Sequence, residues 1–176
     1  MVRSIAVIVS AILLSRPGMP VEDAKRYARV LQQEAKEHGF DPFTGVAMIH
    51  FESNWYPEVV SSNKEDYGLG QIRARYIGAC RDDEDPVNHP SPECRAVQRS
   101  LLDAETNIKQ MAELITNNRK LCRDKTGSAL FHQWLASYQG LNFPKQKKWC
   151  QPRKRTWEVI EYRKKLIREL VLQKKK

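Results

Sequence analysis

Residues 41–57 read DPFTGVAMIHFESNWYP. Asp41 suits the cap of a helix and Pro42 its first turn, because a carboxylate accepts hydrogen bonds from free amides and proline has no amide to satisfy. The positions that follow are almost all apolar up to Phe51, and residues 54–57 are turn formers. A helix that is apolar on every side is a buried one. We therefore expect the rest of the chain to pack around this helix.

The sequence on either side predicts further helices. Apolar residues recur every three or four positions over residues 24–38, 108–122, 131–138 and 156–172. Turn residues dominate the region between the second and third of the five expected helices, so we expect at most a small hairpin there, around Val59–Val60 and Leu69–Ile72. The fold class predicted is mainly α.

Length and charge define the class of protein. The chain has 176 residues, of which 41% are hydrophobic, enough for the core of one domain and too many for a disordered protein. The net charge of +9 is concentrated in residues 144–176, which hold 13 Lys or Arg and three Glu. We expect a main domain over residues 20–150 and a basic C-terminal helix and tail over 151–176. A basic terminal segment is typical of contact with an anionic polymer, and we expect no specific nucleic-acid partner.

The N-terminus is short, positive and then apolar. Arg3 precedes an apolar run over residues 5–14, and Ser15 ends it. This pattern favours a signal peptide or an N-terminal anchor within residues 1–19, although no Ala-x-Ala cleavage site follows. The alternative is a short helix that belongs to the folded domain.

The four cysteines are candidates for two disulfides. Cys80, Cys94, Cys122 and Cys150 are too far apart for a zinc site, and no histidine stands at ligand spacing, so we predict no metal. Their proximity in sequence favours Cys80 with Cys94 and Cys122 with Cys150. Each closure would stabilise the fold by about 3 kcal/mol. Four buried free thiols are the alternative.

Glu52 stands at the end of the most apolar helix. Apolar neighbours disfavour its charged form, and so does the partial negative charge at a helix C-terminus, so both raise the expected pKa. A carboxylic acid that stays protonated near neutral pH can act as the general acid that cleaves a glycosidic bond. The alternative is an exposed glutamate without a role.

Three motifs around Glu52 resemble those of the lytic transglycosylases of the lysozyme-like superfamily, the SLT domain. They are Glu52-Ser53 after a buried helix with Ser61 nine residues on, then Gly68-Leu69-Gly70-Gln71, and then Ala136-Ser137-Tyr138-Gln139-Gly140. They occur in family order and, with the helices between them, cover roughly residues 21–141. The chain departs from the family at Gln139, where the family has Asn, in the shorter spacing to Gly140, and in one extra residue between Ser61 and Gly68.

The resemblance implies a goose-type, lysozyme-like helical domain that acts on peptidoglycan glycan strands. Glu52 would protonate the bond between N-acetylmuramic acid and N-acetylglucosamine, then take the proton from the muramic acid 6-hydroxyl as that oxygen closes a 1,6-anhydro ring. No cofactor is expected. The resemblance also implies a contact between the Tyr138 hydroxyl and the Glu52 carboxyl, and substrate contacts at a further set of residues: Ser61, Tyr67, Gly68, Gln71, Tyr138 and Gln139.

Two other functions fit the same residues. A hydrolytic muramidase would use Glu52 together with Asp66, which would activate water. A non-catalytic binder would keep the groove and hold wall polymer with its basic tail. For the enzyme we expect a monomer that is secreted or periplasmic, since its substrate lies in the bacterial cell envelope and disulfides form in oxidising compartments.

Overall fold

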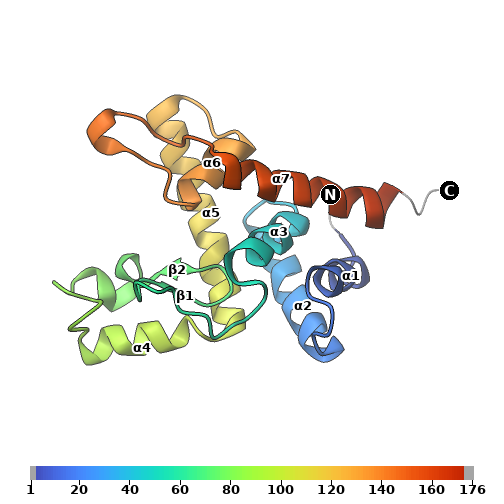
Figure 1. Cartoon of the computed structure of the whole chain (residues 1–176), viewed down its shortest axis with the longest axis horizontal. Coiled ribbons are helices and arrows are strands. Elements are labelled where there is room, and N and C mark those ends of the chain that lie inside the picture. Colours follow the sequence, from blue (N-terminus) through green and yellow to red (C-terminus); the bar gives the residue numbers. More distant parts are fainter. Residues whose placement is uncertain (1–2, 173–176) are drawn as a thin grey trace.

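The computed structural model describes residues 3–172 and is mainly α-helical, as predicted (Figure 1). The helices are α1 (Ile5–Ser15), α2 (Val21–Glu37), α3 (Pro42–Ser53), α4 (Pro92–Ser100), α5 (Ala104–Thr126), α6 (Phe131–Tyr138) and α7 (Lys154–Ile167). Two strands, β1 (Asp66–Tyr67) and β2 (Ile72–Arg73), pair antiparallel, with Asp66 opposite Arg73.

The predicted buried helix, α3, lies in the core. The Asp41 side chain accepts a hydrogen bond from the Phe43 amide at 3.0 Å, and every residue from Pro42 to Ile49 is buried. α3 packs against α1, α2 and α7. Asn54 adopts the left-handed conformation (φ 51°) and ends the helix. Phe51 and Glu52 are only partly buried, so the last turn of α3 reaches the edge of the core.

The apolar N-terminal segment is part of this core. Ile8, Ala11 and Ile12 in α1 have no exposed surface. The Trp55 indole donates a hydrogen bond to the Ser15 hydroxyl at 2.9 Å, which joins the end of α1 to the turn after α3. This arrangement matches the alternative of a helix that belongs to the folded domain. In the structure, α1 therefore packs in the same core as α3.

The basic C-terminal residues also belong to the domain. α7 begins at Lys154 and continues as a π-helical turn (Arg168–Leu172). Its buried face packs on α3 and α6, and its buried residues are Thr156, Val159, Ile160 and Leu166. Asp41 accepts hydrogen bonds from Arg3 at 3.1 and 2.7 Å and from Arg163 at 3.1 Å. This carboxylate therefore links both ends of the chain to α3; the predicted tail beyond residue 172 lies outside the described residues.

The small hairpin forms close to where the sequence predicts it. The strands are displaced from the expected positions, because Val60 makes only an isolated bridge, to Tyr67, and the regular pairs lie at 66–67 and 72–73. α4 was not predicted. Ser91 and Pro92 are typical of a helix start, and in the structure the Ser91 hydroxyl accepts a hydrogen bond from the Cys94 amide. Few apolar residues follow, so the helical spacing is weak.

α5 connects two lobes (Figure 1). The hairpin and α4 lie beside its N-terminal half, and α6 with the loop before α7 lies beside its C-terminal half. Both predicted disulfides are present: Cys80–Cys94 joins the loop after the hairpin to α4, and Cys122–Cys150 joins α5 to the loop before α7. None of the helices in residues 3–172 has the length and apolar composition that a membrane crossing requires.

Candidate active site

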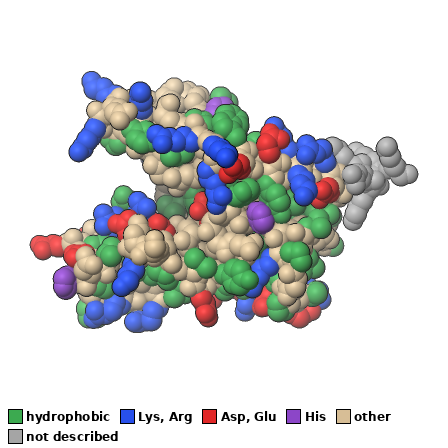
Figure 2. Space-filling view, viewed as in Figure 1, with side chains coloured by type: hydrophobic (Ala, Val, Ile, Leu, Met, Phe, Trp, Pro, Cys, Tyr) green, Lys and Arg blue, Asp and Glu red, His purple; other side chains and the backbone are tan. Residues whose placement is uncertain are grey.

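A cleft of about 770 Å³ lies between the two lobes, and Figure 2 shows the surface hollowed there. Residues of α3, the hairpin, α5, α6, the loop after α6 and α7 form its wall. The lining includes Phe51 and Glu52 of α3; Asp66, Gln71 and Arg73 of the hairpin; Leu114, Asn118 and Leu121 of α5; Ser137 and Tyr138 of α6; and Gln139 and Arg155. The cleft therefore brings together Glu52 and three of the predicted substrate-contacting residues, Gln71, Tyr138 and Gln139.

Glu52 is an acid with a raised pKa. Burial is the main cause, and it raises the pKa of the Glu52 carboxyl from 4.5 to about 7. Arg155 opposes this effect by favouring the carboxylate, whereas the charge of Asp66 adds to it. Arg155 is held away from a direct ion pair, since its guanidinium donates to the Phe51 carbonyl oxygen and lies over the Phe51 ring at 4.6 Å. The carboxyl is therefore partly protonated at neutral pH.

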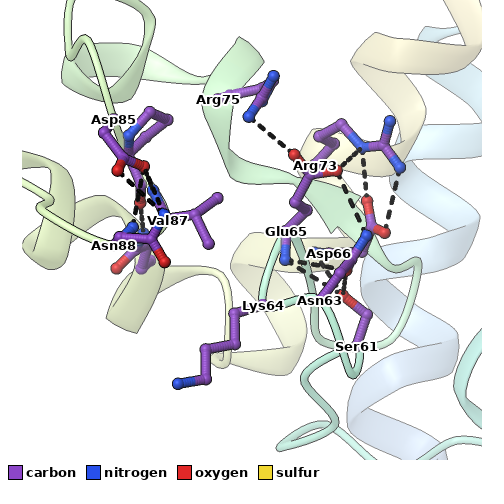
Figure 3. A network of polar contacts seen from close by, with 12 residues as sticks. Ser61, Asn63, Lys64, Glu65, Asp66, Arg73, Arg75, Asp85, Val87 and Asn88 are labelled. Carbon is purple, nitrogen blue, oxygen red and sulfur yellow. Dashed lines mark hydrogen bonds and ion pairs between the residues drawn. The ribbon is translucent and has the colours of Figure 1, made fainter.

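Asp66 faces the same cleft as an anchored carboxylate. Both of its oxygens accept hydrogen bonds from Arg73, at 3.0 and 3.3 Å, across the β1–β2 pair (Figure 3). The neighbouring Glu65 pairs with Arg75 at 2.8 Å. The Arg73 guanidinium therefore holds the Asp66 side chain in place on the wall of the cleft.

Tyr138 joins α6 to the hairpin. Its hydroxyl donates to the Gly70 carbonyl oxygen at 2.7 Å, and no hydrogen bond to Glu52 forms within the described residues. Burial, helped by the charges of Glu52 and Asp66, raises the pKa of the Tyr138 phenol well above 10, so the phenol stays neutral. In place of the expected contact with the Glu52 carboxyl, the Tyr138 hydroxyl therefore ties α6 to the turn of the hairpin.

Two glutamine side chains present polar groups to the cleft. The Gln71 amide nitrogen donates to the carbonyl oxygens of Val59 at 3.1 Å and Gly68 at 2.9 Å, which leaves its side-chain oxygen as an acceptor. The Gln139 side-chain oxygen accepts from the Thr156 hydroxyl at 2.7 Å, and its buried amide nitrogen has no partner among the described residues.

Three other residues that were predicted to contact substrate do not line this cleft. The Ser61 hydroxyl accepts from the Asp66 amide at 2.9 Å and so closes the turn before β1. The buried Tyr67 donates its hydroxyl hydrogen to the Lys64 carbonyl oxygen at 3.0 Å. Gly68 has φ +72°, and a Cβ there would lie 2.2 Å from the Leu101 carbonyl oxygen. Close packing against the residue that ends α4 therefore requires a glycine at this position.

Asn107 is a structural residue of the site that the sequence analysis missed. It is fully buried in α5, and its amide nitrogen donates to the carbonyl oxygens of Tyr67 at 2.8 Å and Leu101 at 2.7 Å. Its oxygen accepts from the Gly70 amide at 2.7 Å. The sequence contained one indication of this role, which is a polar asparagine next to Ile108 on the apolar face of a predicted helix.

We compared the chain with known protein families, curated proteins and solved structures. No family model, no curated protein and no solved structure matches this chain. Among residues 3–172, no three side chains of the metal-binding types gather at one place.

Proposed function

We propose that this protein is a lytic transglycosylase with a lysozyme-like fold, which cleaves the β-1,4 bond between N-acetylmuramic acid and N-acetylglucosamine in peptidoglycan. The observation that carries the proposal is Glu52, an acid with a pKa of about 7 at the end of a buried helix and in the wall of a cleft. The arrangement of two lobes around that cleft, with Gln71 and Gln139 facing it, supports a polymeric polar substrate.

The reaction uses Glu52 twice. In the first step the protonated carboxyl donates its proton to the bridging oxygen, and the bond between that oxygen and the anomeric carbon breaks. In the second step the Glu52 carboxylate accepts the proton of the muramic acid 6-hydroxyl while that oxygen bonds to the anomeric carbon. The nucleophile belongs to the substrate, so its high effective concentration takes the place of an activated water. Glu52 ends protonated, as it began, and the product is a 1,6-anhydro sugar.

The hydrolytic alternative, with Asp66 as the base that activates water, is less well supported. Asp66 lies in the same cleft, but both of its oxygens accept hydrogen bonds from Arg73. A general base has to direct a free carboxylate oxygen at the water, and both Asp66 oxygens are already directed at the Arg73 guanidinium. A purely binding role is also less well supported, because it gives no function to the raised pKa of Glu52.

The two disulfides support a protein that works in an oxidising compartment, and the proposed substrate agrees with secretion or a periplasmic location. Peptidoglycan glycan strands are the proposed partner of a monomeric enzyme that needs no cofactor.

The test is digestion of purified peptidoglycan followed by mass analysis of the fragments. We expect anhydro products, each one water lighter than the hydrolytic product. Glu52→Gln removes the titrating group at nearly constant size and should abolish digestion, while Glu58→Gln, an exposed neighbour, should retain it. Hydrolytic products would favour the muramidase alternative, and full activity in Glu52→Gln would refute the enzyme proposed here.

A further inference from the structure

One loop at the edge of the cleft carries a run of unpaired positive charge. This loop, residues 143–150, is called the basic finger and carries the exposed residues Lys145, Lys147 and Lys148. Within the part of the chain that the structure describes, none of the three forms an ion pair. The cations of α7 are largely paired, in Lys154 and Arg155 with Glu158, Lys164 with Glu161, Lys165 with Glu169, and Arg163 with Asp41. Within the described residues, the finger therefore carries unpaired charge beside the cleft, whereas each Lys and Arg of α7 has an ion-pair partner.

The finger is held in a defined shape. Phe143 and Lys148 exchange two backbone hydrogen bonds, at 2.7 and 3.1 Å, and Cys150 at its end is bonded to Cys122 of α5. Lys147 has φ +54°, in the left-handed region that favours glycine or asparagine. Lys147 ends the 3-10 turn Pro144–Gln146 in this conformation, so the backbone that presents the three lysines has a fixed course.

The finger begins at the wall of the cleft. Asn142 and Pro144 line the same cleft as Glu52. Figure 2 shows Lys and Arg side chains gathered on the upper lobe, above the hollow. A polymer that lies in the cleft would therefore carry its side branches past these lysines.

We propose that the basic finger binds carboxylates on the peptide stems of the glycan strand that occupies the cleft. This inference rests on the proposed function, because the stems are attached to the muramic acid residues of that substrate. Lysine ammonium groups on flexible side chains suit carboxylates whose positions vary from stem to stem. The finger would then select strands that still carry their peptides.

The test compares two substrates prepared from acid-washed peptidoglycan, which is free of attached phosphate polymers: intact strands, and strands stripped of peptides by an amidase. We expect K145Q/K147Q/K148Q to lower kcat/KM on intact strands about tenfold at low salt, through KM, and to leave the rate on stripped strands unchanged. The control R29Q/K36Q/K109Q makes the same change in net charge at exposed positions outside the cleft and should behave as the parent enzyme. The preference of the parent for intact strands should decline as salt rises.

Three results would overturn the inference: an equal loss on stripped strands, an equal loss in the control, or no loss. Binding provides a readout that does not depend on cleavage. Glu52→Gln protein should sediment with intact sacculi more than with stripped sacculi, and this difference should disappear when the three finger lysines are also replaced. If the parent protein does not cleave peptidoglycan but still sediments more with intact than with stripped sacculi, the proposed function is refuted and peptide binding by the finger stands. If the protein sediments only with walls that retain phosphate polymers, peptide binding by the finger is refuted.

Discussion

At the scale of single residues, the acidity of Glu52 comes from its place on α3. Burial is the largest cause of the raised pKa, Arg155 opposes it and Asp66 adds to it. The sequence predicted the direction correctly from the apolar neighbours. It could not predict the two charged residues, since Asp66 and Arg155 are brought to the cleft by separate elements.

The pH dependence of cleavage should follow this pKa. The first step requires the protonated form of Glu52, so we expect kcat/KM to decline above pH 7, by about tenfold per pH unit. Initial rates on soluble glycan strands between pH 5 and 9 provide the measurement. A decline that begins near pH 4.5, the value of an ordinary glutamate, would contradict the assignment.

The same pKa affects stability. The folded-state pKa of about 7 lies above the value of 4.5 for the free side chain, so stability is fully present below pH 4.5 and declines as pH rises toward 7. Glu52→Gln removes the carboxyl group whose ionisation lowers the stability of the folded protein. We expect urea unfolding to show the variant gaining stability over the parent between pH 4 and pH 8, by at most about 3 kcal/mol because the cleft admits water. Glu58→Gln should show no such gain.

Asn107 holds the turn between the strands against α5. Asn107→Ala would leave the Gly70 amide and two buried carbonyl oxygens without partners, at a cost of about 3 kcal/mol or more in the free energy of unfolding. Asn117→Ala, at an exposed position of the same helix, should change this free energy by less than about 0.5 kcal/mol. Equal values for the two variants in chemical denaturation would show that the buried network contributes nothing.

At the scale of elements, local signals predicted helices well where caps and apolar spacing agree. Asp41 caps α3 as expected, Asp103 caps α5 in the same way, and the αL residue Gly127 ends α5. α4 was missed because it buries only Cys94, so that its apolar pattern is weak. The strand positions were displaced because Asn107, a distant residue, holds the turn between them.

α1 provides the test at this scale. Ile12→Ala would leave a cavity in the core and should reduce the free energy of unfolding by about 2 to 5 kcal/mol. Leu14→Ala on the same helix, with 49% of the residue exposed, should cost much less. Thermal unfolding of the full chain measures both. If residues 1–19 were dispensable, the two substitutions would have the same small effect.

At the scale of the whole molecule, the two disulfides hold one lobe each. They close loops of 14 and 28 residues, and each should contribute about 3 kcal/mol by restricting the unfolded chain. Dithiothreitol should therefore lower the urea midpoint of the parent. The variant with all four cysteines replaced by alanine should begin at the lower midpoint and no longer respond to the reductant. A parent insensitive to reductant after its thiols are shown to be free would contradict this contribution.

The sequence by itself determined the helical class, the buried helix α3, both cysteine pairs and the position of the acid, because each depends on residues close together in the chain. The tertiary structure decided what surrounds Glu52. It placed Asp66, Arg155 and the two glutamines in one cleft, assigned Tyr138 to Gly70, and removed Ser61, Tyr67 and Gly68 from the set that faces the cleft. It also placed α1 in the core and, within residues 3–172, paired the cations of α7 while leaving the three lysines of the finger unpaired. The physical reason is that burial and ion pairing depend on contacts between distant segments, which local spacing does not encode.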